Sequence, residues 1–277
     1  MCPSNELEIQ FNSILHHANF NLDGVYFVGD PHGQIENILE TLLRLQADAV
    51  VFLGDFFDKD FNTQALEALR GLFEAIQANN IQLRYILGNH DHPSIEAAEF
   101  FENEYPHLNL NAKVEVLGKH GLRVAGLGGV FRGRVWYPRD TNETPAFYNQ
   151  AELLAQTPRN ERIKGGLPLK QRSTLMPDDY YQLWEQQADV LVTHEAPRYM
   201  ESGFVALDEL VNQMGVKLLV HGHHHIDQIA LSADGKTAVR SLAIAQVWNW
   251  HSSHEYISHE VDLAFAIADK NKSGKLN

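Results

Sequence analysis

The chain contains six short apolar runs, and each ends in polar residues that include glycine or proline. Bulky and β-branched side chains dominate every run, which is the pattern of strands that are buried on both faces. The runs, with the polar residues that follow them, span 24–33, 48–58, 83–92, 122–130, 189–197 and 217–225.

Two stretches between the first three runs have apolar residues at helical spacing, and they predict helices over 34–47 and 62–79. Strand–helix–strand alternation is typical of crossover units, so we expect an α/β fold with a largely parallel sheet. After residue 226 the pattern changes to two alternating runs. The pair Asp234-Gly235 between them predicts a hairpin turn.

The segment 131–186 differs from the rest because it has few clean runs and several prolines. Its first part, 131–172, carries eight Lys or Arg residues against four acids, a local charge of +4. We interpret the chain as a single domain, 1–277, with a basic, cap-like insertion at about 131–186. The insertion is either a solvated loop region or a lid beside an anionic substrate, and the sequence leaves both interpretations open.

Composition narrows the function classes. Of the 277 residues, 44% are hydrophobic, which suits a globular protein with a sizeable core. A net charge of −14 argues against broad electrostatic binding to nucleic acid or to anionic membranes. The single cysteine, Cys2, permits no disulfide within the chain. No apolar run approaches the length of a membrane span, and the polar start does not resemble a secretory signal, so we expect a cytoplasmic protein.

Histidine is common, with fifteen in the chain, and several histidines follow the predicted strands together with Asp and Asn. These side chains could converge because ligands bind beyond the carboxyl ends of parallel strands. Each short motif taken alone is better explained as a turn or a satisfied core residue, but together they indicate a site. The candidate residues are Asp30, His32, Asp55, Asp58, Asn89, His90, His194, His223 and His225.

The donor types indicate which metals would bind. Carboxylate, amide and imidazole groups without a thiolate exclude a structural zinc site of the cysteine type. They suit two borderline divalent ions, with manganese favoured and iron, zinc, cobalt or nickel as alternatives. A pair of metals in a hydrolytic site requires one carboxylate to bridge them.

The ordered motifs "GDPHG", "GDFFDK", "GNHD", "VTHEAP" and "GHHH" resemble the signature of the calcineurin-like metallophosphoesterases, over residues 29–225. The resemblance implies a four-layer α/β/β/α sandwich. It also implies that Asp30, His32 and His225 hold one metal and that Asp55 bridges to the second. Three further residues would complete the second metal site: Asn89, His194 and His223.

The implied chemistry is hydrolysis of a phosphoester by a hydroxide that bridges the two metals. The resemblance assigns His90 as the catalytic histidine, placed to protonate the leaving oxygen as a general acid. Asp58 would orient His90 and raise its pKa.

One position departs from the family pattern. The usual arginine after the second aspartate is Lys59 here, and lysine cannot make the bidentate contact of arginine. Phosphate recognition could therefore involve Lys59, Arg132 or Arg134, although a solvent-exposed arginine pair is an equally simple interpretation of the last two.

We expect a small phosphorylated substrate such as a nucleotide, a cyclic nucleotide, a dinucleoside polyphosphate or a phosphoprotein. The acidity of the chain disfavours long nucleic acid. Two alternatives remain, a non-catalytic interaction scaffold that keeps the fold and a DNA nuclease. The presence of His90 with the whole ligand set favours an enzyme over a scaffold. The sequence does not determine the oligomeric state.

Overall fold

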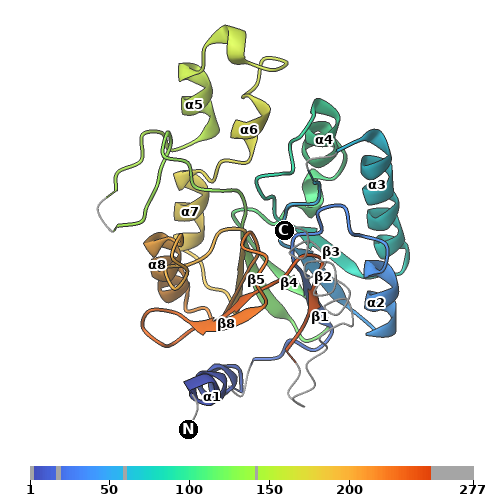
Figure 1. Cartoon of the computed structure of the whole chain (residues 1–277), viewed down its shortest axis with the longest axis vertical. Helices are drawn as coiled ribbons and strands as arrows, with labels where there is room; N and C mark the ends of the chain where they lie inside the picture. Colours follow the sequence, from blue (N-terminus) through green and yellow to red (C-terminus); the bar gives the residue numbers. More distant parts are fainter. Residues whose placement is uncertain (1–2, 17–19, 59–60, 141–142, 251–277) are drawn as a thin grey trace, which may run out of the picture.

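The computed structural model describes residues 3–16, 20–58, 61–140 and 143–250, which form two β-sheets packed face to face (Figure 1). The smaller sheet has the strand order β10-β1-β2-β3, and the larger has the order β4-β5-β6-β7-β9-β8. The strands are β1 (Val25–Val28), β2 (Ala49–Phe52), β3 (Gln82–Tyr85), β4 (Lys113–Leu117), β5 (Leu122–Leu127), β6 (Val190–Thr193), β7 (Leu218–His221), β8 (Gln228–Leu231), β9 (Ala238–Ser241) and β10 (Val247–Trp248).

All six predicted strands are present, as β1, β2, β3, β5, β6 and β7. The first three are mutually parallel, and so are the last three. Strands β8 and β9 form the predicted antiparallel hairpin around Asp234-Gly235. Periodicity alone predicted one largely parallel sheet, whereas the family resemblance implied two. Two sheets are observed. Periodicity could not predict this, because a buried run does not specify which neighbour covers each of its faces.

Alternate side chains of each strand enter different cores. In β1, Phe27 packs between the two sheets while Tyr26 faces the helices, and in β2 the same alternation separates Val51 from Phe52. Burial on both faces explains why these strands are uninterrupted apolar runs.

Helices form the two outer layers of the sandwich. Helices α2 and α3 pack on the smaller sheet, and α7 and α8 pack on the larger one (Figure 1). The α-helices are α1 (Pro3–Leu15), α2 (Ile38–Arg44), α3 (Thr63–Ala78), α4 (Ile95–Glu99), α5 (Gln150–Gln156), α6 (Leu169–Arg172), α7 (Pro177–Trp184) and α8 (Val205–Met214). Short π or 3-10 turns lie at η1 (Phe100–Glu104), η2 (Pro106–Leu108) and η3 (Arg159–Glu161).

Both predicted helices are observed, and α3 shows the physical reason. Leu66, Leu69, Phe73 and Ile76 recur at helical spacing and are all buried against the smaller sheet. The side chain of Asn62 caps the helix by accepting a hydrogen bond from the Ala65 N–H at 2.9 Å. Capping and one apolar face together set the start and the orientation of the helix.

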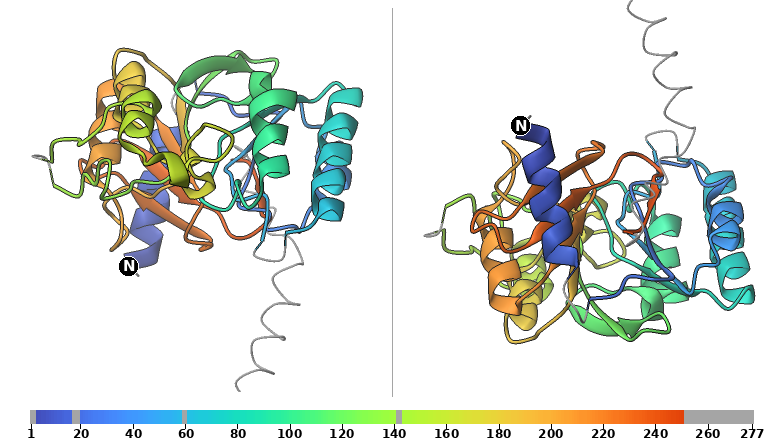
Figure 2. Two further views of the ribbon diagram at one scale, coloured as in Figure 1. Left: turned by 90° about the horizontal axis from the view of Figure 1, so that it is seen from above. Right: turned by 90° about the horizontal axis from the view of Figure 1, so that it is seen from below.

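The larger sheet extends beyond the smaller one, and α1 covers the inner face that this leaves (Figure 2). Helix α1 packs on β8 and β9, and its Phe11 and Leu15 join the core between the sheets. Without this helix the inner apolar side chains of the hairpin would face water.

The predicted insertion contains α5, η3, α6 and α7. Helix α7 packs against α8 and β5 in the outer layer, whereas α5 and α6 project beyond the sheets (Figure 1). Several basic residues of this segment have structural partners. Arg162 donates to the backbone oxygens of Leu154 and Thr157, and Arg172 pairs with Glu102. The division of the chain into one domain with a cap stays a prediction.

Candidate metal centre

The loops after β1 and β2 are joined by backbone hydrogen bonds. The N–H of His32 donates to the carbonyl of Asp55 at 2.9 Å, and Gly33 donates to Phe56 at 2.9 Å. Because β1 and β2 are parallel neighbours, their carboxyl ends lie at one edge, and these bonds align the two loops. Asp30 and Asp55 are thereby brought to the same place although 25 positions separate them in sequence.

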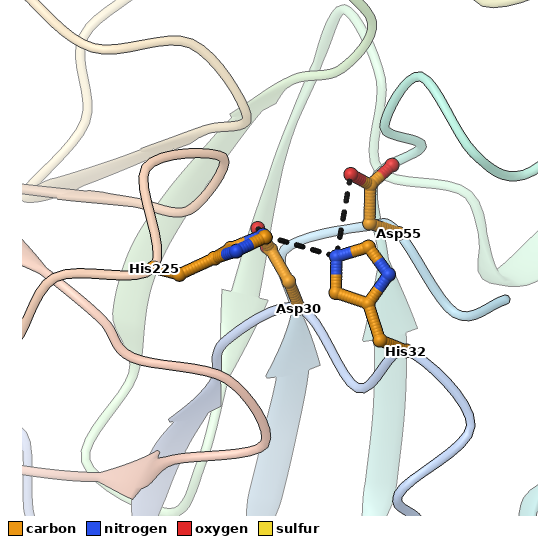
Figure 3. Close-up of side chains that lie close together, drawn as sticks. All are labelled: Asp30, His32, Asp55 and His225. Carbon is orange, nitrogen blue, oxygen red and sulfur yellow. Dashed lines mark hydrogen bonds and ion pairs between the residues drawn. The ribbon is translucent and has the colours of Figure 1, made fainter. Parts of the chain in front are cut away.

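A first group of donor atoms consists of Asp30, His32, Asp55 and His225, with one atom from each residue within 4.8 Å of all the others (Figure 3). The Nε2 atoms of His32 and His225 are 3.0 Å apart, and His225 Nε2 is 3.2 Å from Asp30 Oδ2. His32 Nε2 lies 3.8 Å from Asp55 Oδ2. Two carboxylates and two imidazoles that point at one position form a candidate cation site.

A second group lies beside the first and consists of Asp55, His194 and His223. His194 Nε2 is 3.4 Å from Asp55 Oδ2 and 3.3 Å from Asn89 Oδ1. The ring centroids of His194 and His223 are 4.9 Å apart. Asn89 therefore lies at this second group, next to His194, with which the family resemblance associated it.

Asp55 belongs to both groups, and its surroundings favour the charged carboxylate. Burial alone would raise the pKa of Asp55, but the charge and hydrogen bond of His194 hold that pKa well below its usual range. Burial likewise opposes protonation of His194, yet Asp55 and Asp30 outweigh it and raise its pKa to about 10. A buried negative charge surrounded by imidazoles has the electrostatic character of a cation site.

The chemistry of these residues fits divalent metals. Asp30 is fully buried, and its Oδ1 has no hydrogen-bond donor among the described residues. A buried carboxylate oxygen without a donor is costly unless a cation satisfies it. The mixture of oxygen and imidazole nitrogen donors suits transition metals better than calcium or magnesium. The structure thus brings all seven predicted ligands together, while their individual roles and the identity of the metal stay predictions.

Four residues of the two groups have a left-handed backbone. The φ angles are 44° at His32, 52° at Asp55, 68° at His223 and 56° at His225. A positive φ is uncommon for residues with a side chain, and clusters of such residues are typical of functional sites. The backbone turns here so that ligating side chains from short loops point inward.

Two glycines allow the loops to approach these side chains. A Cβ on Gly222 would collide with Asp30 Oδ1, and a Cβ on Gly88 would collide with Asp55 Oδ1 and His194 Cε1. Glycine is required at both positions because the backbone itself forms a wall of the site.

Sequence reasoning assigned no role to Asp91, although the motif "GNHD" contains it. The Asp91 carboxylate is fully buried and accepts hydrogen bonds from the N–H groups of Asp55 (2.9 Å), Phe56 (2.7 Å) and Gly88 (2.6 Å). Burial and the nearby Asp55 raise the pKa of Asp91 to about 7. Asp91 therefore holds the backbone of Asp55, the predicted bridging residue. The sequence signal for this role was the position of Asp91 in the turn-forming motif "GNHD".

The family is settled by sequence. A sequence model of the calcineurin-like phosphoesterases matches residues 24–227, which is most of the chain. The chain belongs to this family. The match confirms the predicted family, and the two packed sheets with helices outside confirm the four-layer fold class. The matched residues include the region from β1 to the end of β7 and the loop after it, which carries both donor groups.

Similar proteins include an uncharacterized protein of Haemophilus influenzae, which is 36% identical over 202 residues, or 73% of this chain and 83% of the relative. TT1561 of Thermus thermophilus is a solved structure with a TM-score of 0.48 and 17% identity, covering 80% of this chain and 89% of the other. Phosphopantetheinyl hydrolase of Mycobacterium tuberculosis has a TM-score of 0.47 and 12% identity, covering 85% and 98%.

Of the two predicted catalytic residues of this phosphoesterase, His90 contacts the centre. His90 donates its backbone N–H to Asp55 Oδ1 at 2.7 Å, and its ring centroid is 5.3 Å from that of His32. Asp58 is exposed in the loop after β2. Lys59 lies outside the described residues. The roles of all three stay predictions.

The two candidate arginines of the phosphoesterase differ in environment. Arg132 is half-buried and lines a pocket together with Asn89 and His223, whereas Arg134 is exposed and is not among the residues that line it. Glu195, which sequence reasoning did not single out, lines the same pocket and lies 3.9 Å from His223. Burial raises the pKa of Glu195 to about 7. The structure thus places Arg132 in the wall of this pocket, whereas Arg134 is not among its lining residues.

Proposed function

We propose that this phosphoesterase is a metal-dependent hydrolase of small phosphate esters. The observation that carries the proposal is that two groups of metal-ligand side chains share one buried carboxylate, Asp55. A shared carboxylate is what a two-metal hydrolytic site requires, because the two cations must lie a few ångströms apart. Asp30, His32 and His225 would hold one ion, and Asn89, His194 and His223 the other.

Two divalent cations, when bound, supply Lewis-acid stabilisation of the phosphoryl charge and lower the pKa of a water molecule. The protein side chains supply the remaining parts. His90 protonates the departing oxygen, since its loop is held against Asp55 by the backbone hydrogen bond. Asp58 orients His90 in this proposal.

Arg132 is the residue we propose for the phosphoryl group. It lines the pocket with Asn89 and His223, and burial lowers the pKa of its guanidinium without an ion pair to a carboxylate among the described residues. A half-buried cation of this kind gains from an anionic ligand. Lys59 and Arg134 are further candidates for phosphate recognition in this proposal.

The substrate we propose is small and phosphorylated, of nucleotide type or a phosphoprotein, because a chain of charge −14 repels long polyanions. Manganese is the proposed metal, with iron, zinc, cobalt or nickel as alternatives. A single cysteine is compatible with the cytoplasm, where we place the protein. No helix of the described part is long and apolar enough to cross a membrane.

The test combines metal analysis with turnover of p-nitrophenyl phosphate and its bis ester, each with Mn²⁺, Zn²⁺, Co²⁺ or Ni²⁺. We expect hydrolysis with at least one metal and its loss in Asp55→Asn. The control is Asp23→Asn, which removes a charge from an exposed carboxylate. A failure of every metal to support turnover of either ester overturns the proposal and favours a scaffold.

A further inference from the structure

A pocket of about 370 Å³ opens beside the candidate metal centre. Asn89 and His223 connect it to the second donor group, and the charged residues Arg132 and Glu195 also line it. Lys170, Tyr137 and Ser202 are more exposed and lie toward its mouth. The pocket therefore joins the centre to the insertion, which contributes Arg132, Tyr137 and Lys170.

Neither Arg132 nor Lys170 forms an ion pair among the described residues, although the Glu195 carboxylate of the same pocket acts on the Arg132 charge from a longer distance. Among the described residues, the side chain of Arg132 donates one hydrogen bond, from Nη2 to Ser173 Oγ at 3.3 Å, and its buried Nε has no partner. Lys170 forms no ion pair within the described part of the chain. Arg172 and Lys164 of the same insertion are instead paired, with Glu102 and Glu99.

Tyr137 supplies an aromatic surface at the mouth. The residue is 37% exposed, and its ring centroid lies 5.1 Å from that of Phe204 in an edge-to-face arrangement. The guanidinium of Arg139 lies 5.3 Å from the Tyr137 ring centroid. These contacts hold the ring in place, so it is preorganised to pack against a planar group.

Arg132 is half-buried in the pocket and Lys170 is exposed, so we assign these two cationic side chains different roles. Metal ions held at the donor groups, together with the more buried Arg132, would neutralise a phosphoryl group bound there. Lys170 at the mouth is then left for a different negative charge. A leaving group that extends from the phosphoryl position into the pocket would lie among its lining residues, which include Tyr137 and Lys170.

We infer that the pocket binds the leaving group, and that it selects phosphate esters whose leaving group combines a planar ring with a second anionic group. Tyr137 contacts the ring, and Lys170 binds the anion. The inference rests on the proposed function and specifies its substrate class.

The test uses phenyl phosphate and 3-carboxyphenyl phosphate, which differ by one carboxylate on the same ring. The quantity measured is the ratio of kcat/KM for the charged ester to kcat/KM for the neutral one. We expect Lys170→Gln to lower that ratio about three- to fivefold, as an exposed ion pair would, and Lys170→Glu to lower it further. Lys164→Gln is the matched control, because it removes one positive charge of the insertion away from this pocket.

A second comparison tests the ring. Tyr137→Ala should raise KM for phenyl phosphate and leave KM for ethyl phosphate unchanged, while Tyr137→Phe should retain the wild-type values. An unchanged charge ratio in both Lys170 variants, with turnover intact, overturns the leaving-group assignment and leaves the proposed function standing. Absence of turnover in the wild-type protein with every metal overturns both.

Discussion

The carboxylate of Asp91 holds the backbone of Asp55, because Asp91 Oδ2 accepts the Asp55 N–H at 2.9 Å. The same oxygen accepts the N–H of Gly88 at 2.6 Å, and Oδ1 accepts that of Phe56 at 2.7 Å. One buried side chain thereby fastens the loop after β2 to the loop after β3. This contact explains how a residue outside both donor groups controls their geometry.

Asp91→Asn should therefore destabilise the protein and impair the site. An amide has one acceptor oxygen, so its NH₂ group would face a backbone N–H, and each unsatisfied buried group costs about 1–3 kcal/mol. We expect a lower midpoint of thermal unfolding and reduced metal content. Asp23→Asn, at an exposed position, should change neither. A variant with wild-type unfolding and full metal content would show that Asp91 does not position Asp55.

The close approach at Gly222 predicts a second sensitive position. A methyl group in Gly222→Ala collides with Asp30 Oδ1, so the loop or the carboxylate must move. We expect metal content and activity to fall together. Gly71→Ala is the control, because nothing lies near its Cβ and alanine in α3 should stabilise the helix by up to about 1 kcal/mol. Full metal content in Gly222→Ala would contradict the packing argument.

The general-acid role of His90 predicts a dependence on the leaving group. In His90→Asn we expect metal content to be retained and turnover of an alkyl phosphate to fall ~10²–10⁴-fold. With p-nitrophenyl phosphate the loss should be much smaller, because p-nitrophenolate departs without protonation. Kinetics with both esters provide the measurement. Equal losses for both would indicate that His90 acts in binding instead.

Metal removal should destabilise the folded protein. The buried carboxylates of Asp30 and Asp55 both belong to the first donor group, and the repulsion between their charges is stronger when no cation lies between them. A metal at one hundred times its Kd stabilises the native state by about 2.7 kcal/mol. The midpoint temperature of thermal unfolding should therefore rise when Mn²⁺ or Zn²⁺ is added to chelator-treated protein, and it should rise less with Ca²⁺. Asp55→Asn should abolish most of the shift, and an unchanged shift would remove Asp55 from the site.

A pair away from the site gives a prediction for pH. Arg123 Nη2 lies 2.7 Å from Asp189 Oδ1, and the pair joins the starts of β5 and β6. Burial alone would raise the pKa of Asp189, but hydrogen bonds from Arg123 outweigh it and lower that pKa. A lowered folded-state pKa stabilises the protein above the unfolded value near 4, and this contribution is lost as the pH falls through the folded value. The stability difference between wild type and Asp189→Asn should hence shrink in acid, as measured by urea unfolding at several pH values.

Sequence periodicity was enough to predict the six principal strands, α2, α3 and the β8–β9 hairpin. Runs such as Val50–Phe52 report that both faces of a strand are buried, and local spacing encodes that information directly. It does not encode what covers each face, which is why two sheets could not be distinguished from one by periodicity. The identity of the donor residues was also readable, because Asp, His and Asn recur at the ends of the runs.

The amino-acid sequence by itself therefore determined the six principal strands, two helices, one hairpin and the family, and it supplied a set of candidate metal-ligand side chains. Only the tertiary structure decided that His32 and His225, 193 positions apart, place their nitrogens 3.0 Å from each other. It also decided that Asp91 supports Asp55 and that Arg132, rather than Arg134, lines the pocket. The physical reason is that strand and helix patterns arise from neighbouring residues, whereas a site arises where loops from distant strands are brought to one edge by sheet pairing and packing.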